Sequence, residues 1–272
     1  MHAHSFLRSP FVSRRSVIKG VAAGALAVSC WIPAQAQAQA AMATAINRMG
    51  RFRALSQRIA KAYCQLHLSV DTKQAGQVLE TARKLVRTGF DDLAKSPLPT
   101  DLAGPLADVR KLYEELESKL VMPPTRESVG AVTTQADKLL VAANAATVAL
   151  EKQAKISTGT LVNTAGSQRY LSQRLAKSYF LAAAGLGDKA LRDQMVADKA
   201  EFIKNLATLA AAPVNTTTIR NELLMGEQQW IFFHASLERE PDARGLHAVA
   251  TSSENLLEVM NNLTVQYEAV SK

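Results

Sequence analysis

The sequence predicts an all-α protein made of two tandem up-down four-helix bundles. Three observations support this fold class. Aromatic residues make up only 6% of the 272 residues, while Ala, Leu, Gln and Lys are plentiful, and this composition favours helices over strands. Apolar residues recur at spacings of three and four, as on the buried face of a bundle helix. One stretch of the chain is also repeated 116 residues later.

The repeat is clearest between residues 46–63 and 162–179, where ten of eighteen positions are identical. The correspondence continues to the end of the chain, with an offset that changes from 116 to 117 near 98–105. Pro99, Gly104 and Pro105 mark a loop there, and loops tolerate insertions. We therefore expect two domains of similar length, 41–156 and 157–272, called the first and second halves below.

Each half should contain four helices, because prolines and capping residues divide it into four amphipathic segments. Asp71, Thr125, Asp188 and Asp242 are candidate N-caps. Short connections favour antiparallel neighbours. The expected helices are 42–68, 71–95, 101–120 and 126–155 in the first half, and 158–184, 188–211, 216–238 and 242–271 in the second.

The connection between the halves allows two arrangements. No proline occurs between 126 and 184, so the last helix of the first half could continue into the first helix of the second. One long helix would then stack the bundles end to end. A break near Gly159 would instead place the bundles side by side as a pseudo-dimer.

Residues 1–40 resemble an export signal. Arg14 and Arg15 lie in a stretch similar to a twin-arginine signal, and the apolar run 21–32 is too short to span a membrane comfortably. We expect cleavage and a soluble periplasmic protein, since no later segment is long and apolar enough to cross a bilayer. An uncleaved anchor and a lipoprotein formed at Cys30 are the alternatives. Candidate cleavage sites of the A-x-A type end at Ala36, Ala38 and Ala40.

Composition and motifs argue against two function classes. The formal net charge is +8, but four basic residues lie in the first forty, and the rest are interleaved with acids, unlike a nucleic-acid-binding surface. No metalloprotease, nucleophile-elbow or phosphate-loop motif occurs, so we expect neither an enzyme nor a cofactor or metal. Cys64 would be the only cysteine after cleavage and is expected to be a small buried residue.

The most informative residues form a polar strip on the first helix of each half. Glycine inside a helix costs about 1 kcal/mol relative to alanine, so its recurrence suggests a close approach to the backbone. Arginine one turn later supplies planar donors that suit a small oxyanion, and Asn47 and Asn163 could add amide donors. The alternatives are an ordinary solvated helix face and a purely structural role in helix packing, in which Ser56 and Ser172 on the inner face permit close approach. The strips are Gly50, Arg53, Gln57 and Lys61, and Gly166, Arg169, Gln173 and Lys177.

Residues 163–175, read as NTAGSQRYLSQRL, resemble the signature of the type IV pili methyl-accepting chemotaxis transducer N-terminal (PilJ-type) domain. They are also similar to the P-box of nitrate/nitrite sensor kinases. This resemblance implies a dimerising periplasmic four-helix bundle in which one arginine from each subunit binds a shared nitrate. It assigns that role to Arg169, with Gly166 and Ser167 beside it. In the first half the resemblance assigns the same role to Arg53, with Gly50 beside it, and Arg51 stands in place of the serine.

Two functions follow as expectations. The first is a soluble sensor-type protein that binds a nitrate- or nitrite-like anion, either alone or as a homodimer. Receptors of the family carry signalling or kinase domains after this module, and no such domain is recognised in this sequence. We therefore expect a separate membrane receptor or sensor kinase to receive the signal. The second is a ligand-free module that docks on a chemotaxis or type IV pilus receptor. A strip buried between two helices would favour the first, and an exposed strip the second. The aromatic stretch 230–233 is expected to be core or a partner surface.

Overall fold

The computed structural model describes residues 34–96, 102–154 and 157–271, and throughout these ranges the regular structure is helical. The predicted all-α class is therefore confirmed, and seven of the eight predicted helices agree with the structure within about two residues at each end, the usual uncertainty of helix ends. The helices are α1 (Ala34–His67), α2 (Thr72–Ala94), α3 (Ala103–Lys119), α4 (Arg126–Ala154), α5 (Ser157–Ala183), α6 (Lys189–Ala210), α7 (Thr217–Leu237) and α8 (Ala243–Ala269).

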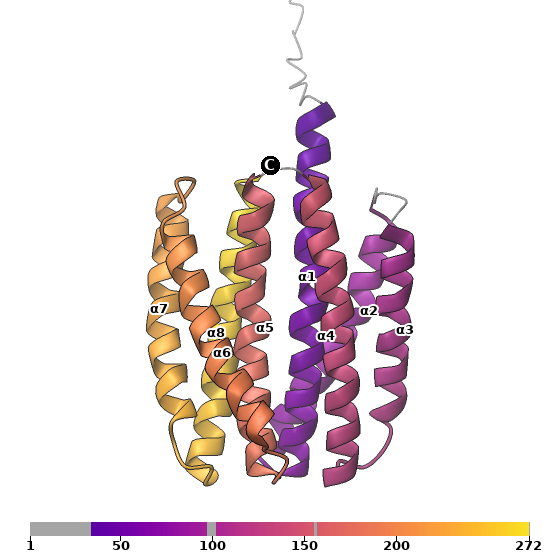
Figure 1. Ribbon diagram of the computed structural model, residues 1–272, viewed down its shortest axis with the longest axis vertical. Helices are drawn as coiled ribbons and strands as arrows, with labels where there is room; N and C mark the ends of the chain where they lie inside the picture. Colours follow the sequence, from indigo (N-terminus) through magenta and orange to yellow (C-terminus); the bar gives the residue numbers. More distant parts are fainter. Residues whose placement is uncertain (1–33, 97–101, 155–156, 272) are drawn as a thin grey trace, which may run out of the picture. The chain divides into compact units, whose positions relative to one another are not determined.

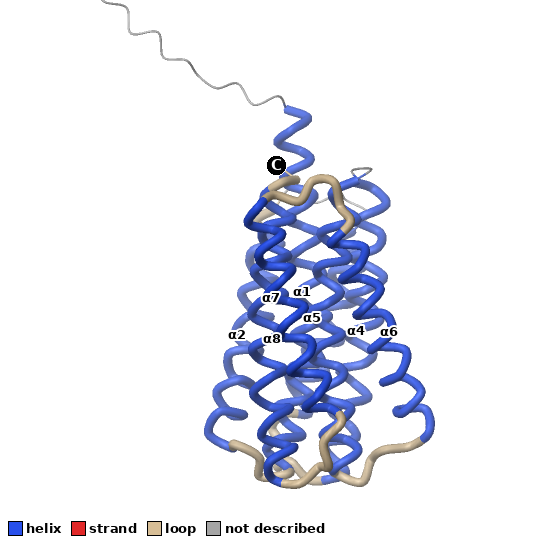
Figure 2. Tube along the Cα trace, turned by 90° about the vertical axis from the view of Figure 1, so that its left-hand side faces the viewer, coloured by secondary structure: helices blue, strands red, loops and turns tan. Residues whose placement is uncertain are grey.

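The second four helices repeat the packing of the first four. Helix α1 packs on α2 and α4, and α4 packs on α3. In the same way α5 packs on α6 and α8, and α8 packs on α7. The two sets lie side by side, because α1 also packs extensively against α5 (Figure 1). All eight helices run roughly along one direction, with the loops at two ends (Figure 2).

The side-by-side arrangement decides between the two predicted connections. Helix α4 ends at Ala154 and a separate helix α5 begins at Ser157, so the expectation of one long continuous helix with end-to-end stacking is wrong. A straight continuation would leave the polar strips of α1 and α5 and the apolar residues beside them in water. Packing α5 along α1 buries both faces together, and this tertiary gain outweighs local helix continuity.

Three of the four predicted N-caps are confirmed. The Asp188 and Asp242 carboxylates accept the backbone N–H of the third residue that follows each of them, and the Thr125 hydroxyl accepts that of Ser128. Asp71 precedes α2 but makes no capping bond. Its backbone is left-handed, with φ at 43°, and its carboxylate instead contacts His247 Nδ1 at 2.7 Å.

The core contains an aromatic pair in each half. The rings of Phe52 and Phe90 stack with centroids 4.4 Å apart, and those of Phe202 and Trp230 stack at 4.2 Å. Cys64 is a free, buried thiol, as expected, and burial raises its pKa to about 12. The stretch 230–233 is divided: Trp230 and Phe233 are core, whereas Ile231 and Phe232 are exposed.

The first helix begins earlier than predicted. Helix α1 starts at Ala34 rather than near residue 42, because the Ala-Gln alternation read as a cleavage region also consists of good helix formers. Its first turns extend past the ends of the neighbouring helices (Figure 1). The candidate cleavage positions Ala36, Ala38 and Ala40 lie in these turns, and the rest of the predicted signal lies outside the described residues. Among the described helices, none is long and apolar enough to cross a membrane.

Candidate functional site

The predicted site lies in the seam, which we define as the contact between α1 and α5. The polar strips of both helices face into it, and their Arg, Gln and Lys side chains are buried. Arg53 keeps 1% of its surface exposed and Arg169 keeps 2%. The alternative of an ordinary solvated face is therefore wrong. Buried charges are expensive unless they are paired, so the contacts of the two guanidinium groups decide what the seam can bind.

Arg53 is held entirely by neutral groups. Its Nε donates to the carbonyl of Gly50 at 3.3 Å, and Nη1 and Nη2 donate to the amide oxygens of Asn144 and Asn163, each at 2.8 Å. The guanidinium carbon also lies 5.3 Å from the ring centroid of Tyr170, within the range of a cation–π interaction. Asn163 and Tyr170 come from the second half, so Arg53 links the two halves without neutralising its charge.

Arg169 has fewer partners than Arg53. Its Nη2 donates to the backbone carbonyl of Asn47 at 3.3 Å, and its buried Nε has no hydrogen-bond partner. The amide oxygen of Asn47 is likewise buried without a partner, although the matching oxygen of Asn163 accepts from Arg53. Buried polar groups are rarely left unsatisfied in folded proteins, so this side of the seam offers a donor to a ligand.

Burial dominates the electrostatics of both arginines. Burial, together with the nearby charges of Arg51 and Arg53, lowers the pKa of Arg169 to about 9 against the opposing effect of Glu268. Burial lowers the pKa of Arg53 to about 10, against the opposing effects of Tyr170 and Glu151. Both groups stay protonated at neutral pH. In the described part of the chain no ion pair joins either one to a carboxylate, so the seam carries two buried positive charges.

The two guanidinium groups converge on a glycine. A Cβ added to Gly166 would lie 3.2 Å from Nη2 of Arg169 and 3.2 Å from Nη2 of Arg53, so these nitrogens are no further apart than twice that distance. A Cβ on Gly50 would lie 2.8 Å from Nη2 of Arg53. The glycines thus keep space open beside the charges, as the sequence suggested.

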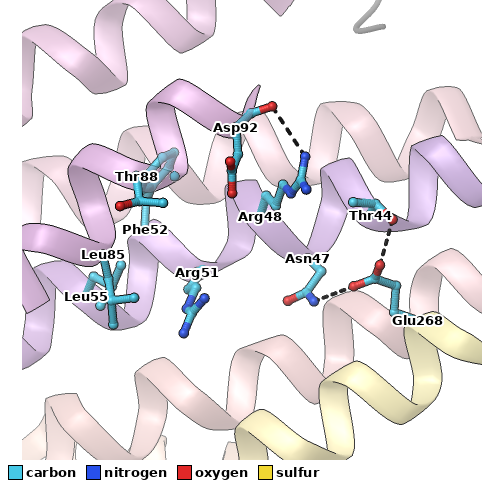
Figure 3. Close-up of a pocket in the computed structure, with 11 residues that line it drawn as sticks. Thr44, Asn47, Arg48, Arg51, Phe52, Leu55, Leu85, Thr88, Asp92 and Glu268 are labelled. Atoms are coloured by element: carbon cyan, nitrogen blue, oxygen red, sulfur yellow. Dashed lines mark hydrogen bonds between the residues drawn. The ribbon is translucent and has the colours of Figure 1, made fainter. Parts of the chain in front are cut away.

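Carboxylates from opposite halves hold the two asparagines. Glu268 accepts from the Asn47 amide and from the Thr44 hydroxyl, each at 2.6 Å (Figure 3). The matching contacts in the seam join Glu151 to Asn163 and Thr160. Glu151 and Glu268 are separated by the repeat offset of 117, so the structure repeats at this level too.

Reciprocal salt bridges close the seam further along the helices. Lys61 Nζ lies 2.5 Å from a carboxylate oxygen of Glu254, and Lys177 Nζ lies 2.5 Å from one of Asp137. Each bridge joins one half to the other. Burial lowers the pKa of both lysines and the partner carboxylates oppose this effect. These bridges fix the register of α1 and α5 and hence the positions of the arginines.

A pocket of about 290 Å³ adjoins the seam between α1, α2 and α8 (Figure 3). Asn47 and Glu268 line it, and the carbonyl of Asn47 also receives the bond from Arg169. Arg48, on the same wall, donates to the backbone carbonyl of Asp92 at 3.3 Å. Asn47 therefore lies between this pocket and the two buried arginines.

Six of the seven predicted site residues meet in the seam. They are Asn47, Gly50, Arg53, Asn163, Gly166 and Arg169. Ser167 does not join them, because its hydroxyl donates to the carbonyl of Asn163 within α5 at 3.0 Å. Its counterpart Arg51 is exposed and lines the adjoining pocket.

Sequence reasoning missed the side chains that hold Arg53 and the two asparagines. Asn144, Tyr170, Glu151 and Glu268 were not among the predicted site residues. A signal was present for three of them, because Asn144 recurs as Asn261 and Glu151 recurs as Glu268 at the repeat offset. Tyr170 has no such signal, since Ala54 occupies its position in the first half.

A known protein family matches the first half of the chain. Residues 35–148 match the family model of the type IV pili methyl-accepting chemotaxis transducer N-terminal domain. This PilJ-type domain covers α1 to most of α4 and includes Arg53, Gly50 and Asn144. It indicates a sensory module related to chemotaxis and pilus transducers, a class that is not catalytic. The searches of curated proteins and of solved structures gave no match.

Proposed function

We propose that the protein is a non-catalytic sensor that binds one small oxyanion, of the nitrate or nitrite type, between Arg53 and Arg169. The observation that carries the proposal is the pair of buried guanidinium groups from opposite halves, which approach the same glycine without a bonded carboxylate. A planar anion can accept hydrogen bonds from two guanidinium forks. The single negative charge of such an anion would offset one of two positive charges whose burial is otherwise unfavourable.

We further propose that the chain is a duplicated PilJ-type domain and acts as its own dimer. The resemblance to nitrate sensor kinases implies one arginine from each of two subunits at a shared axis. Here one arginine would come from each half. The offsets of 116 and 117 that relate Arg53 to Arg169, Lys61 to Lys177, and Asp137 to Glu254 support this proposal.

The docking module remains the second candidate, because the matched family is defined by transducers of type IV pili and its description names no ligand. Burial of both strips between two helices favours the anion sensor. On either reading a membrane receptor or sensor kinase would receive the signal. The twin-arginine-like residues Arg14 and Arg15 support the periplasm as the place where this occurs.

Thermal unfolding at constant ionic strength tests the proposal. Nitrate at a hundred times its dissociation constant should stabilise the fold by about 2.7 kcal/mol, which corresponds to a rise in Tm of roughly 5–11 °C for a chain of this size. Chloride and sulfate serve as controls for size and charge. A rise with nitrate or nitrite alone is the expected result. Equal shifts with every anion, or none, would favour the docking module.

A further inference from the structure

Helix α7 presents an unusual surface to solvent. We define the α7 stripe as Asn221, Leu224, Met225, Gln228, Ile231, Phe232 and Ala235, all of which are exposed. The four large apolar side chains keep between 46% and 65% of their surface exposed. None of the seven residues is charged. An exposed patch of this kind usually marks an interaction site.

The stripe has the periodicity of a helix–helix contact. Leu224 and Ile231 are seven residues apart, as are Met225 and Phe232, and Gln228 lies between the two pairs. Such a heptad-like spacing keeps side chains aligned along one face of two packed helices. Single exposed apolar residues are common on protein surfaces. Scattered exposure of that kind does not explain two apolar pairs, Leu224 with Ile231 and Met225 with Phe232, on the same face of one helix.

Helix α6 widens the apolar surface. Val196 is 70% exposed and Ile203 is 53% exposed. They stand three residues before and four residues after Lys199, and therefore on the same face of α6. Lys199 forms an ion pair with Glu238 at the end of α7, so this face of α6 turns toward α7. The two residues are therefore exposed on a face of α6 that neighbours α7.

The first half provides a comparison within the same molecule. At the positions of α3 that match Met225, Gln228, Ile231 and Phe232, the residues are Asp108, Lys111, Glu114 and Glu115, and all four are exposed. At the positions of α2 that match Val196 and Ile203, the residues are Glu80 and Arg87. The fold therefore accepts a charged outer face at this place, and the apolar face of the second half needs another explanation.

We infer that the α7 stripe is a homodimer interface, in which α7 packs antiparallel against α7 of a second copy of the chain. A two-fold axis at Gln228 would place Leu224 opposite Phe232 of the second copy, and Met225 opposite Ile231 of the second copy. Gln228, the residue nearest the axis, is neutral, and the exposed Glu227 beside it lies at the edge of the α7 stripe. Such a contact is self-complementary and closes at two molecules.

The available area fits a dimer. The 21 residues of α7 span roughly 31 Å at 1.5 Å per residue. Together with the bordering face of α6, about 20 Å wide when two helices of roughly 10 Å are counted, they offer roughly 600 Å² per copy. The total of about 1,200 Å² lies at the lower end of stable interfaces, and an apolar, uncharged centre is typical of homodimers.

Light scattering combined with size-exclusion chromatography of the full chain tests this inference. The wild-type chain should form a concentration-dependent dimer. Replacing Ile231→Glu and Phe232→Glu introduces the residues of the first half and should weaken the dimer at least about 100-fold, because two apolar side chains lose their burial. Val141→Glu is the matched control, since Val141 is an exposed valine on α4 and its replacement should leave the dimer unchanged.

A cross-linking experiment reports on the axis directly. With Cys30→Ser as the background, Gln228→Cys should be joined to its copy by a short bis-maleimide, whereas Lys111→Cys at the matching place in the first half should not. Cys64 is buried and should not react. A wild-type chain that is monomeric at every concentration, or equal cross-linking of both variants, would overturn the inference. So would a monomer that binds lipid vesicles through the stripe, because the occupant would then be a membrane.

Discussion

Replacing Arg169 by methionine should make the protein more stable in the absence of anion. Burial and neighbouring arginines lower the pKa of this group from 12.5 to about 9. At about 1.4 kcal/mol per pH unit, keeping Arg169 charged in the folded state costs about 5 kcal/mol. Loss of its one hydrogen bond to Asn47 and imperfect repacking return roughly 1–3 kcal/mol. The expected gain for Arg169→Met is therefore about 2 kcal/mol or more, similar to other replacements of buried charges by apolar residues.

Urea unfolding followed by circular dichroism, in a buffer whose only anion is bulky and organic, measures this gain. Arg53→Met is the informative control. Arg53 donates to Gly50, Asn144 and Asn163, so its removal leaves buried acceptors without donors and should give no gain in stability. If Arg169→Met were less stable than the wild type by more than about 1 kcal/mol, a well-satisfied structural role would explain Arg169 better than an uncompensated charge.

Three further predictions follow from the same contacts. Gly166→Ala would place a Cβ 3.2 Å from both guanidinium groups, so calorimetry should show that nitrate binding is lost while the stability of the anion-free protein rises by up to about 1 kcal/mol. The control Gly130→Ala, whose Cβ would have nothing within 4 Å, should gain stability and keep nitrate binding. Wild-type nitrate affinity in Gly166→Ala would contradict the site. Nitrate affinity should be constant from about pH 6 to 8 and should fall by up to about tenfold per pH unit above the folded pKa of Arg169, and affinity that is unchanged at about pH 10.5 would exclude Arg169. Above the same pKa the stability of the wild type relative to Arg169→Met should rise, because a lowered pKa destabilises the fold most while the group is protonated in both the folded and the unfolded state. Burial raises the pKa of Glu254, but the charges of Lys61 and a neighbouring arginine outweigh burial and hold this pKa at about 2. Glu254→Gln should therefore lower the free energy of unfolding by about 3 kcal/mol at pH 7, measured by chemical unfolding. This contribution of Glu254 should disappear as pH falls from 4.5 toward 2, and an equal loss at pH 2 would refute the ion pair.

The helices could be predicted because their ends are encoded locally. Asp188 and Asp242 form the capping bonds that their positions suggest. The break between Ala154 and Ser157 could not be predicted in the same way, because no proline interrupts the sequence there. That break follows from the packing of α5 along α1, a contact between residues more than a hundred positions apart. Local propensity cannot report such a contact.

The candidate site was predictable in composition but not in detail. The repeat pointed to both arginines, both glycines and both asparagines. It could not show that Arg53 would bond to Asn163 across the seam while Arg169 bonds only to a backbone carbonyl. This asymmetry arises from the tertiary placement of side chains that the two halves share. It is also the reason that the two arginine variants are expected to differ.

Isothermal titration of the full chain with nitrate counts the anions bound per chain, and a site shared by the two halves fixes that number at one. We expect one nitrate per chain, an unchanged ratio whether the chain is a monomer or a dimer, and loss of binding in Arg53→Met and in Arg169→Met separately. Two nitrates per chain, or binding that survives in either variant, would contradict a single anion held between the two arginines.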